Sequence, residues 1–353
     1  MKRFWIFSIF ICLIAIGTVA QAQDSRTNKD QPSAALKFSY RANGFNAISS
    51  AERVPEGLFG FKPGAAGVSS LKPHKTSSGH ASAQERPDFS KLIQAMDKEG
   101  CAVHEESGVR VCKRDYSVDG KNVEAISFEP RGGGRHPGLL LIPGHATTAR
   151  DWISNGLTYA GNGYAGLAVS QPGYGKSEGP GDYVGPRTIK VLTEGYRRLQ
   201  RETFVDAGRM GIVGYSRGGM AASLLVVQLD DVKAAVLGAG VYDFKKQYDD
   251  TGLDGIRANM KAETGMTEDA IRQRSSVLQM EKLKCPVLIL HGEKDINVPV
   301  SQAYLLRDRL TSLKKEFEIQ VFPDLPHGIG PQNLYKYSLD FLKRKLAGEP
   351  GKK

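Results

Sequence analysis

One five-residue segment, 214–218, constrains the fold of this chain more than any other stretch. It reads Gly-Tyr-Ser-Arg-Gly, it follows the apolar run 210–213, and a helix-forming stretch, 219–227, comes directly after it. Where a strand turns this sharply into a helix, the side chain at the corner is exposed, and only glycines two residues to either side let neighbouring backbone pass so close. The pattern therefore predicts that Ser216 presents its hydroxyl at the carboxyl end of a strand, with the N–H of Arg217 at a helix N-terminus.

Two later segments place an acid and a histidine in equivalent positions. The apolar run 286–290 predicts a buried strand with Asp295 in the loop after it, and the run 317–322 predicts another strand with His327 after it. Open parallel sheets place their active sites at the carboxyl ends of the strands. The chain order serine, acid, histidine is that of the α/β-hydrolase fold. Asp243, which follows the preceding strand, is the alternative acid.

These three residue types together suit nucleophilic catalysis. A serine hydroxyl is a poor nucleophile at neutral pH and needs a base within hydrogen-bond reach. His327 can take the proton of Ser216, while Asp295 can hold the imidazole in the required tautomer and stabilise the imidazolium. The backbone N–H of Arg217, at a helix N-terminus, can stabilise a developing oxyanion.

From about residue 120 to residue 346 the chain resembles a known family, the α/β-hydrolases of the dienelactone-hydrolase and prolyl-oligopeptidase-like branch, which includes bacterial esterases of the acetyl xylan esterase type. Dienelactone hydrolases proper use a cysteine where this chain has Ser216. Prolyl oligopeptidases carry a large N-terminal propeller, for which about 100 upstream residues are too few. Both departures favour a stand-alone serine esterase. The segments that carry the resemblance are Leu141–His145, Gln171–Ser177, Gly214–Gly219, His291–Asp295 and Pro326–Gly328.

The resemblance implies further site residues. It places the second oxyanion donor at the backbone N–H of His145, because Pro143-Gly144 matches a His-Gly pair in the family. It also suggests Tyr174, since oligopeptidase relatives carry a tyrosine that helps the oxyanion in a comparable loop. Tyr174 and Tyr215 are therefore candidates for lining the site.

The order of predicted elements agrees with this fold class. Residues 109–118 and 123–128 predict a β-hairpin that turns at Asp119-Gly120. From residue 138 onward strand-like and helix-like segments alternate, which predicts an α/β fold with a doubly wound, mostly parallel sheet. Residues 241–283 form a polar, helix-leaning insertion. It is either a small cap over the site or a solvated excursion that makes no contact with substrate.

The amino-terminal segment predicts export. Met1-Lys2-Arg3, an apolar stretch to Ala20 and the small-residue pattern at 20–22 form a secretory signal peptide, residues 1–22. The mature protein is then expected to be secreted or periplasmic, with no stable membrane insertion. The alternative is an uncleaved membrane anchor. Residues 23–87 are predicted to be a low-complexity flexible segment, 88–346 the folded hydrolase domain, and 347–353 a basic tail.

Composition limits the partners. The net charge is +10, but the basic residues are scattered, without the aromatic-interleaved patch of a nucleic-acid-binding protein. The histidines form no metal-binding pattern and no nucleotide-binding motif is present, so no metal or cofactor is expected. Cys101 and Cys112 flank a Ser-Gly turn and form either a disulfide or two buried thiols, whereas Cys285 is expected to be an inert core thiol. The oligomeric state is left open.

Together these features predict an exported serine hydrolase that cleaves carboxylic esters through an acyl-enzyme intermediate. The expected substrate is a small-molecule or carbohydrate-linked ester. A first alternative is a serine peptidase of the prolyl-oligopeptidase or acylaminoacyl type, for which the sequence shows no acidic site that would bind an N-terminal amine. A second alternative is a non-catalytic binding protein on a hydrolase fold, which the presence of Ser216, Asp295 and His327 disfavours.

Overall fold

The computed structural model of the protein describes residues 88–347. The expected signal peptide, the segment 23–87 and nearly all of the basic tail lie outside the described residues, so these expectations remain predictions. Within residues 88–347, no helix has the length and apolar character needed to cross a membrane.

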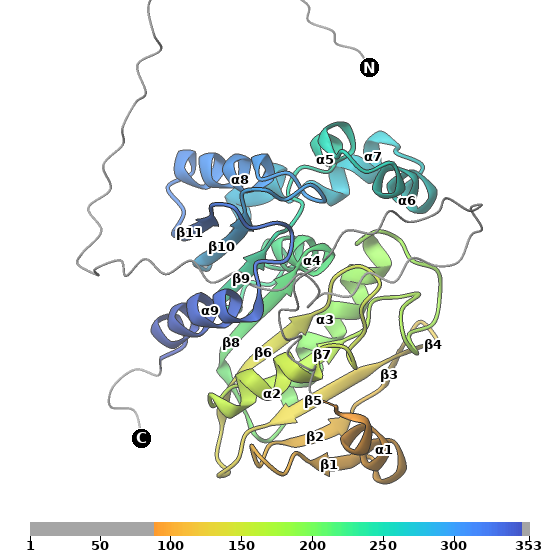
Figure 1. Ribbon diagram of the computed structural model, residues 1–353, viewed down its shortest axis with the longest axis vertical. Helices are drawn as coiled ribbons and strands as arrows, with labels where there is room; N and C mark the ends of the chain where they lie inside the picture. The colour runs from red at the N-terminus through yellow and green to blue at the C-terminus, as the bar shows by residue number, and fades with distance from the viewer. Residues whose placement is uncertain (1–87, 348–353) are drawn as a thin grey trace, which may run out of the picture. The chain divides into compact units, whose positions relative to one another are not determined.

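A nine-stranded sheet in the order β1-β2-β5-β7-β6-β8-β9-β10-β11 forms the centre of the domain (Figure 1). Its strands are β1 (Cys101–Val103), β2 (Arg110–Lys113), β5 (Ala125–Glu129), β6 (His136–Ile142), β7 (Ala165–Val169), β8 (Val205–Tyr215), β9 (Ala234–Gly238), β10 (Val287–Gly292) and β11 (Phe317–Phe322). A separate two-stranded sheet consists of β3 (Tyr116–Val118) and β4 (Lys121–Val123). From β7 to β11 neighbouring strands run parallel, and β1, β2 and β5 add an antiparallel edge. The predicted α/β-hydrolase fold class is confirmed.

Helices cover both faces of this sheet. They are α1 (Ser90–Glu99), α2 (Ile153–Gly161), α3 (Pro186–Arg201), α4 (Arg217–Leu225), α5 (Phe244–Asp250), α6 (Asp254–Thr264), α7 (Glu268–Arg274), the 3₁₀ helix η1 (Ser276–Lys282), α8 (Ser301–Ser312) and α9 (Pro331–Lys345). Side chains along a strand point alternately to the two faces, so β6 sends Leu139 and Leu141 into one core and Leu140 and Ile142 into the other. The first core is closed by α1, α2 and α9, and the second by α3, α4 and α8.

The predicted hairpin at Asp119-Gly120 exists, but its strands are shorter than the sequence pattern indicates. Of the described strands, β3 and β4 pair only with each other, and both turn residues have positive φ angles, as a tight hairpin requires. The chain leaves the main sheet after β2 because Tyr116 is buried against α3, where its hydroxyl donates to the carbonyl of Val191 at 2.7 Å. The predicted long strands 109–118 and 123–128 are therefore each divided, and β2 pairs with β5 instead.

The antiparallel edge also settles the state of two cysteines. Cys101 on β1 lies directly opposite Cys112 on β2, and the two form a disulfide. Cys285 is a free, buried thiol, and burial raises its pKa to about 12. It is therefore protonated at neutral pH and is a poor nucleophile.

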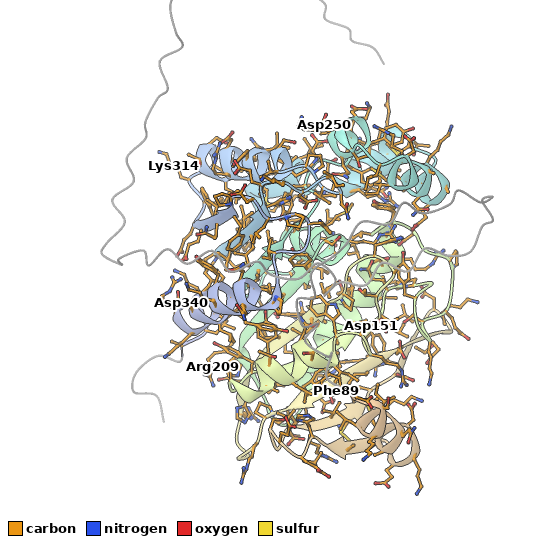
Figure 2. The ribbon with its side chains drawn as sticks, in the orientation of Figure 1. Phe89, Asp151, Arg209, Asp250, Lys314 and Asp340 are labelled. Atoms are coloured by element: carbon orange, nitrogen blue, oxygen red, sulfur yellow. A yellow bond between two sulfur atoms is a disulfide. The ribbon has the colours of Figure 1, made fainter. Side chains whose placement is uncertain are left out.

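The insertion 241–283 folds into α5, α6, α7 and η1, which lie together next to the carboxyl ends of the central strands (Figure 1). Asp250, the last residue of α5, lies at the upper edge of this group in Figure 2. A hydrogen bond of 2.8 Å between the hydroxyls of Ser223 on α4 and Ser276 on η1 ties the insertion to the helix that follows Ser216.

Candidate active site

The turn between β8 and α4 has the sharp geometry that the glycines predict. Ser216 has φ 57° and ψ −122°, a sparsely populated conformation that costs on the order of 1–3 kcal/mol. A Cβ on Gly214 would lie 2.1 Å from the carbonyl oxygen of Gly218, and one on Gly218 would lie 2.0 Å from that of Ile142. No other residue fits at these two positions. The N–H of Ser216 donates to the carbonyl of Gly238 on β9 at 2.7 Å, which holds the turn against the sheet.

Three side chains from the ends of β8, β10 and β11 form a continuous hydrogen-bonded series. Ser216 Oγ lies 2.8 Å from His327 Nε2, and His327 Nδ1 lies 2.7 Å from Asp295 Oδ2. The other carboxylate oxygen, Asp295 Oδ1, accepts from the N–H groups of Asn297 and Val298, both at 2.9 Å. A carboxylate that accepts from Nδ1–H leaves Nε2 free to accept the serine proton. The structure thus brings together the three residues that the sequence singles out.

The environment of Asp295 keeps its carboxylate charged. Burial by itself would raise the pKa of this side chain, but hydrogen bonds from His291 and His327 outweigh burial and lower the pKa to about 2. His291 is fully buried, its Nε2 donates to the carbonyl of Val298 at 2.8 Å, and this nitrogen lies 3.3 Å from Asp295 Oδ2. Sequence reasoning assigned His291 no role of its own beyond its place in the segment His291–Asp295. Its position in the His-Gly-Glu-Lys-Asp segment, four residues before Asp295, was the available signal.

The alternative acid, Asp243, has a different role in the structure. Its Oδ1 accepts from the N–H of Lys246 at 2.9 Å, so the side chain caps the N-terminus of α5. The carboxylate that bonds His327 is that of Asp295.

The two expected oxyanion donors lie next to Ser216. Arg217 begins α4, and the loop that carries His145 passes so close that a Cβ on Gly144 would lie 3.3 Å from Ser216 Cβ. Within residues 88–347, neither the N–H of Arg217 nor that of His145 bonds another protein group. Both are therefore available to an oxygen atom of a substrate. The His145 ring is neutral at neutral pH, because burial and the charge of Arg217 lower its pKa to about 4.

The two tyrosines suggested as lining residues lie behind the site rather than in its wall. The hydroxyl of Tyr174 bonds His145 Nδ1 at 2.8 Å. The hydroxyl of Tyr215 donates to the carbonyl of His327 and accepts from the N–H of Ile329. Tyr215 directly precedes Ser216, and neighbouring residues at a strand end point to opposite sides. The ring of Tyr215 therefore lies on the side opposite to the Ser216 hydroxyl and supports the loop that carries His327. A tyrosine that sequence reasoning did not select, Tyr183, lines the pocket instead.

A small pocket opens beside Ser216. The insertion supplies Gln247, Ile256 and Asn259 to its wall, so part of the segment 241–283 faces the site. None of the lining side chains is a carboxylate. The full set is His145, Tyr183, Ser216, Arg217, Met220, Val241, Gln247, Ile256, Asn259, Asn297, Val298 and His327.

The side chain of Arg217 connects the serine turn to the insertion. This residue is 5% exposed, its Nη2 donates to Glu263 Oε1 at 2.7 Å, and its Nη1 donates to the hydroxyl of Tyr174. The guanidinium carbon lies 3.9 Å from the centroid of the Tyr183 ring. The second oxygen of Glu263 accepts from the N–H of Tyr183 at 2.7 Å. Sequence reasoning assigned only the backbone of Arg217 and missed Glu263, because a single acid in a polar insertion gives no signal of its own.

Comparison with known proteins agrees with this geometry. Residues 183–349 match the prolyl oligopeptidase family. The chain has the α/β-hydrolase fold, and less than half of it is similar to the prolyl oligopeptidase family. It is 28% identical over 231 residues to the uncharacterized peptidase YtmA of Bacillus subtilis, an alignment that covers 64% of this chain and 88% of YtmA.

Solved structures of α/β-hydrolases share the fold at low sequence identity. Acylaminoacyl peptidase from Pyrococcus horikoshii matches with a TM-score of 0.61 and 19% identity, over 76% of this chain and 45% of the archaeal chain. Acetyl xylan esterase 1 from Thermoanaerobacterium sp. JW/SL YS485 matches with a TM-score of 0.57 and 17% identity, over 74% of this chain and 92% of the esterase. The hydrolase region thus spans less than half of the archaeal peptidase but nearly all of the esterase.

The ion pair between Arg217 and Glu263 yields a testable expectation for this hydrolase. Glu263→Ala leaves a buried guanidinium without its carboxylate, so we expect the free energy of unfolding to fall by about 3 kcal/mol. Asp254→Ala, on the same helix, removes a nearly fully exposed partner of Arg257 and is expected to cost less than about 1 kcal/mol. Urea denaturation of the two variants checks the difference. Equal losses would show that the buried pair contributes no more than a surface pair.

Proposed function

We propose that this protein is a serine hydrolase that forms an acyl-enzyme on Ser216. The observation that carries the proposal is the series Ser216–His327–Asp295, with distances of 2.8 and 2.7 Å, which ends in a hydroxyl at the wall of a pocket. A serine, a histidine base and a buried carboxylate in this arrangement supply the nucleophile, the proton acceptor and the group that stabilises the imidazolium.

In the proposed reaction, Ser216 Oγ attacks the carbonyl carbon of the substrate while His327 Nε2 takes the serine proton. The backbone N–H groups of Arg217 and His145 stabilise the oxyanion of the tetrahedral intermediate. His327 then gives the proton to the leaving amine or alkoxide, and the acyl group stays on Ser216. Water, activated by the same imidazole, attacks the ester in the second half of the reaction and releases the acid.

For the substrate we propose a short peptide or peptide derivative whose amino end is blocked. Peptidases predominate among the named relatives, among them the dipeptidyl-peptidase 5 sequences and YtmA, and this supports an amide as the scissile bond. The ester hydrolase that the sequence predicts is the second candidate. The likeness to acetyl xylan esterase concerns the fold alone, but the same acyl-enzyme chemistry cleaves both esters and amides.

The charges around the pocket support a blocked amino end. A free N-terminal ammonium that leaves water needs an acceptor, preferably a carboxylate. No carboxylate lines the pocket, and both oxygens of nearby Glu263 are already occupied by Arg217 and the N–H of Tyr183. Arg217, which is paired with Glu263, offers an ammonium no acceptor. An N-acetyl group carries no charge and avoids this penalty.

A matched substrate panel tests the proposal. At pH 7 the kcat/KM of N-acetyl-alanine p-nitroanilide is expected to exceed that of alanine p-nitroanilide by at least about tenfold, because most of the free amine is then protonated. The rate with the free-amine substrate is expected to rise with pH as its amine loses its proton.

The Ser216→Ala variant, labelling by a fluorophosphonate and p-nitrophenyl esters of the same acyl groups complete the panel. A preference for the free-amine substrate at pH 7 would overturn the blocked-substrate proposal. Cleavage of esters without any cleavage of anilides would favour the ester hydrolase. Failure of the probe to label Ser216 would favour the non-catalytic alternative.

A further inference from the structure

Gln247 on α5 lines the pocket and carries a buried polar atom that no described residue bonds. The residue is fully buried, and its Nε2 donates to the carbonyl of Asn297 at 2.7 Å. No group among residues 88–347 bonds its Oε1. Leaving a buried acceptor unsatisfied costs on the order of 1–3 kcal/mol, and most such groups in proteins have a partner.

The orientation of this amide follows from its neighbour. Asn297 offers a carbonyl oxygen, which only the NH₂ of Gln247 can bond, and exchanging the amide O and N would place two oxygens against each other. The unsatisfied atom is therefore an acceptor. Gln247 and Ser216 both line the pocket, so a molecule bound there lies next to this side chain.

The remainder of the pocket indicates which part of a substrate enters. Met220, Val241, Ile256 and Val298 give the wall an apolar character, which suits a short side chain. The acyl part of a substrate stays bonded to Ser216 after the first step, whereas the leaving group has to diffuse away. The acyl part is thus the one that benefits from a pocket beside Ser216.

We propose that Gln247 Oε1 accepts a hydrogen bond from a hydroxyl or amide N–H on the acyl residue of the substrate. The inference rests on the proposed function and adds a specificity for acyl residues with a short polar side chain, such as serine, threonine or homoserine. A site built to bond such a donor discriminates against the analogue that lacks it, because the buried acceptor is then left unpaired.

Isosteric substrate pairs give the sharpest test. N-acetylseryl and N-acetyl-2-aminobutyryl p-nitrophenyl esters differ by OH against CH₃, as do the threonyl and valyl pair and the homoserinyl and norvalyl pair. We expect the hydroxyl-to-methyl ratio of kcat/KM in at least one pair to be about tenfold higher in the wild type than in Gln247→Leu. Comparison of the two ratios removes the intrinsic reactivity of each ester.

The same comparison separates specificity from damage. Loss of the bond from Gln247 to the Asn297 carbonyl can disturb the loop of Asp295. Such a disturbance lowers kcat/KM for both substrates of a pair alike and leaves their ratio unchanged. Ile256→Val, which alters the pocket wall without touching an acceptor, is expected to leave every ratio unchanged. An unchanged ratio in all three pairs for Gln247→Leu would overturn the inference.

Binding to Ser216→Ala makes the test independent of turnover. Isothermal titration calorimetry uses the amides of the same acyl residues. In at least one pair, Ser216→Ala is expected to bind the hydroxyl-bearing amide more tightly than its methyl analogue. The double variant Ser216→Ala, Gln247→Leu is expected to lose that preference. Equal Kd values within every pair would contradict the inference even if no substrate were hydrolysed. If the Ser216→Ala variant still hydrolysed substrate at the wild-type rate, that result would instead contradict the proposed function.

Discussion

Ser216→Ala is expected to keep the fold and to lower the turnover of ester or anilide substrates by at least about 10³-fold. The change removes the proposed nucleophile, whereas the proposed oxyanion donors, Arg217 and His145, and the pocket remain and account for the residual rate. Steady-state kinetics with an N-acetylated ester, together with thermal melting of the same samples, checks both parts of the expectation.

Ser312→Ala, on the exposed end of α8, provides the matched control. Among the residues that the structure describes, the hydroxyl of Ser312 bonds only the carbonyl of Arg309, so this variant is expected to keep wild-type turnover. A Ser216→Ala variant that keeps more than a tenth of the activity would rule out Ser216 as the nucleophile.

Asp295→Asn is expected to lower kcat by about 10⁴-fold, because an amide can present its NH₂ to His327 Nδ1 and thereby favour the wrong imidazole tautomer. The loss should appear in kcat more than in KM, since Asp295 lies behind His327 and not in the pocket wall. Measurement of both parameters for one substrate checks this division.

Asp243→Asn is the corresponding control at the end of the preceding strand. Asparagine caps a helix about as well as aspartate, so α5 is expected to stay intact and turnover to change by less than about threefold. If Asp243→Asn proved the more damaging variant, Asp243 and not Asp295 would be the acid.

The arrangement of Ser216, Asp295 and His327 could be predicted from the sequence because parallel strands end at the same edge of a sheet. Each of the three residues follows an apolar run, and the runs are strong enough to show as strands. The glycines at 214 and 218 were equally informative, since the close backbone contacts that they permit exclude any side chain.

Contacts that depend on side-chain direction could not be predicted. The acid that pairs with Arg217 lies in a polar insertion, and no periodicity distinguishes Glu263 from other acids there. Tyr174 and Tyr215 are close to Ser216 in sequence or loop position, yet both rings lie behind the site because their hydroxyls have partners there. The division of the predicted hairpin into β3 and β4 depends on the burial of Tyr116 against α3, a contact 75 residues away in the sequence.

The pair formed by Arg217 and Glu263 has a consequence for how this enzyme can be altered. Specificity in hydrolases is often changed by exchanging the insertion over the site, here residues 241–283. An exchange that lacks an acid at the place of Glu263 would leave the charge next to the nucleophile uncompensated. Arg217 and helix α6, which carries Glu263, therefore have to be inherited, or engineered, as a unit.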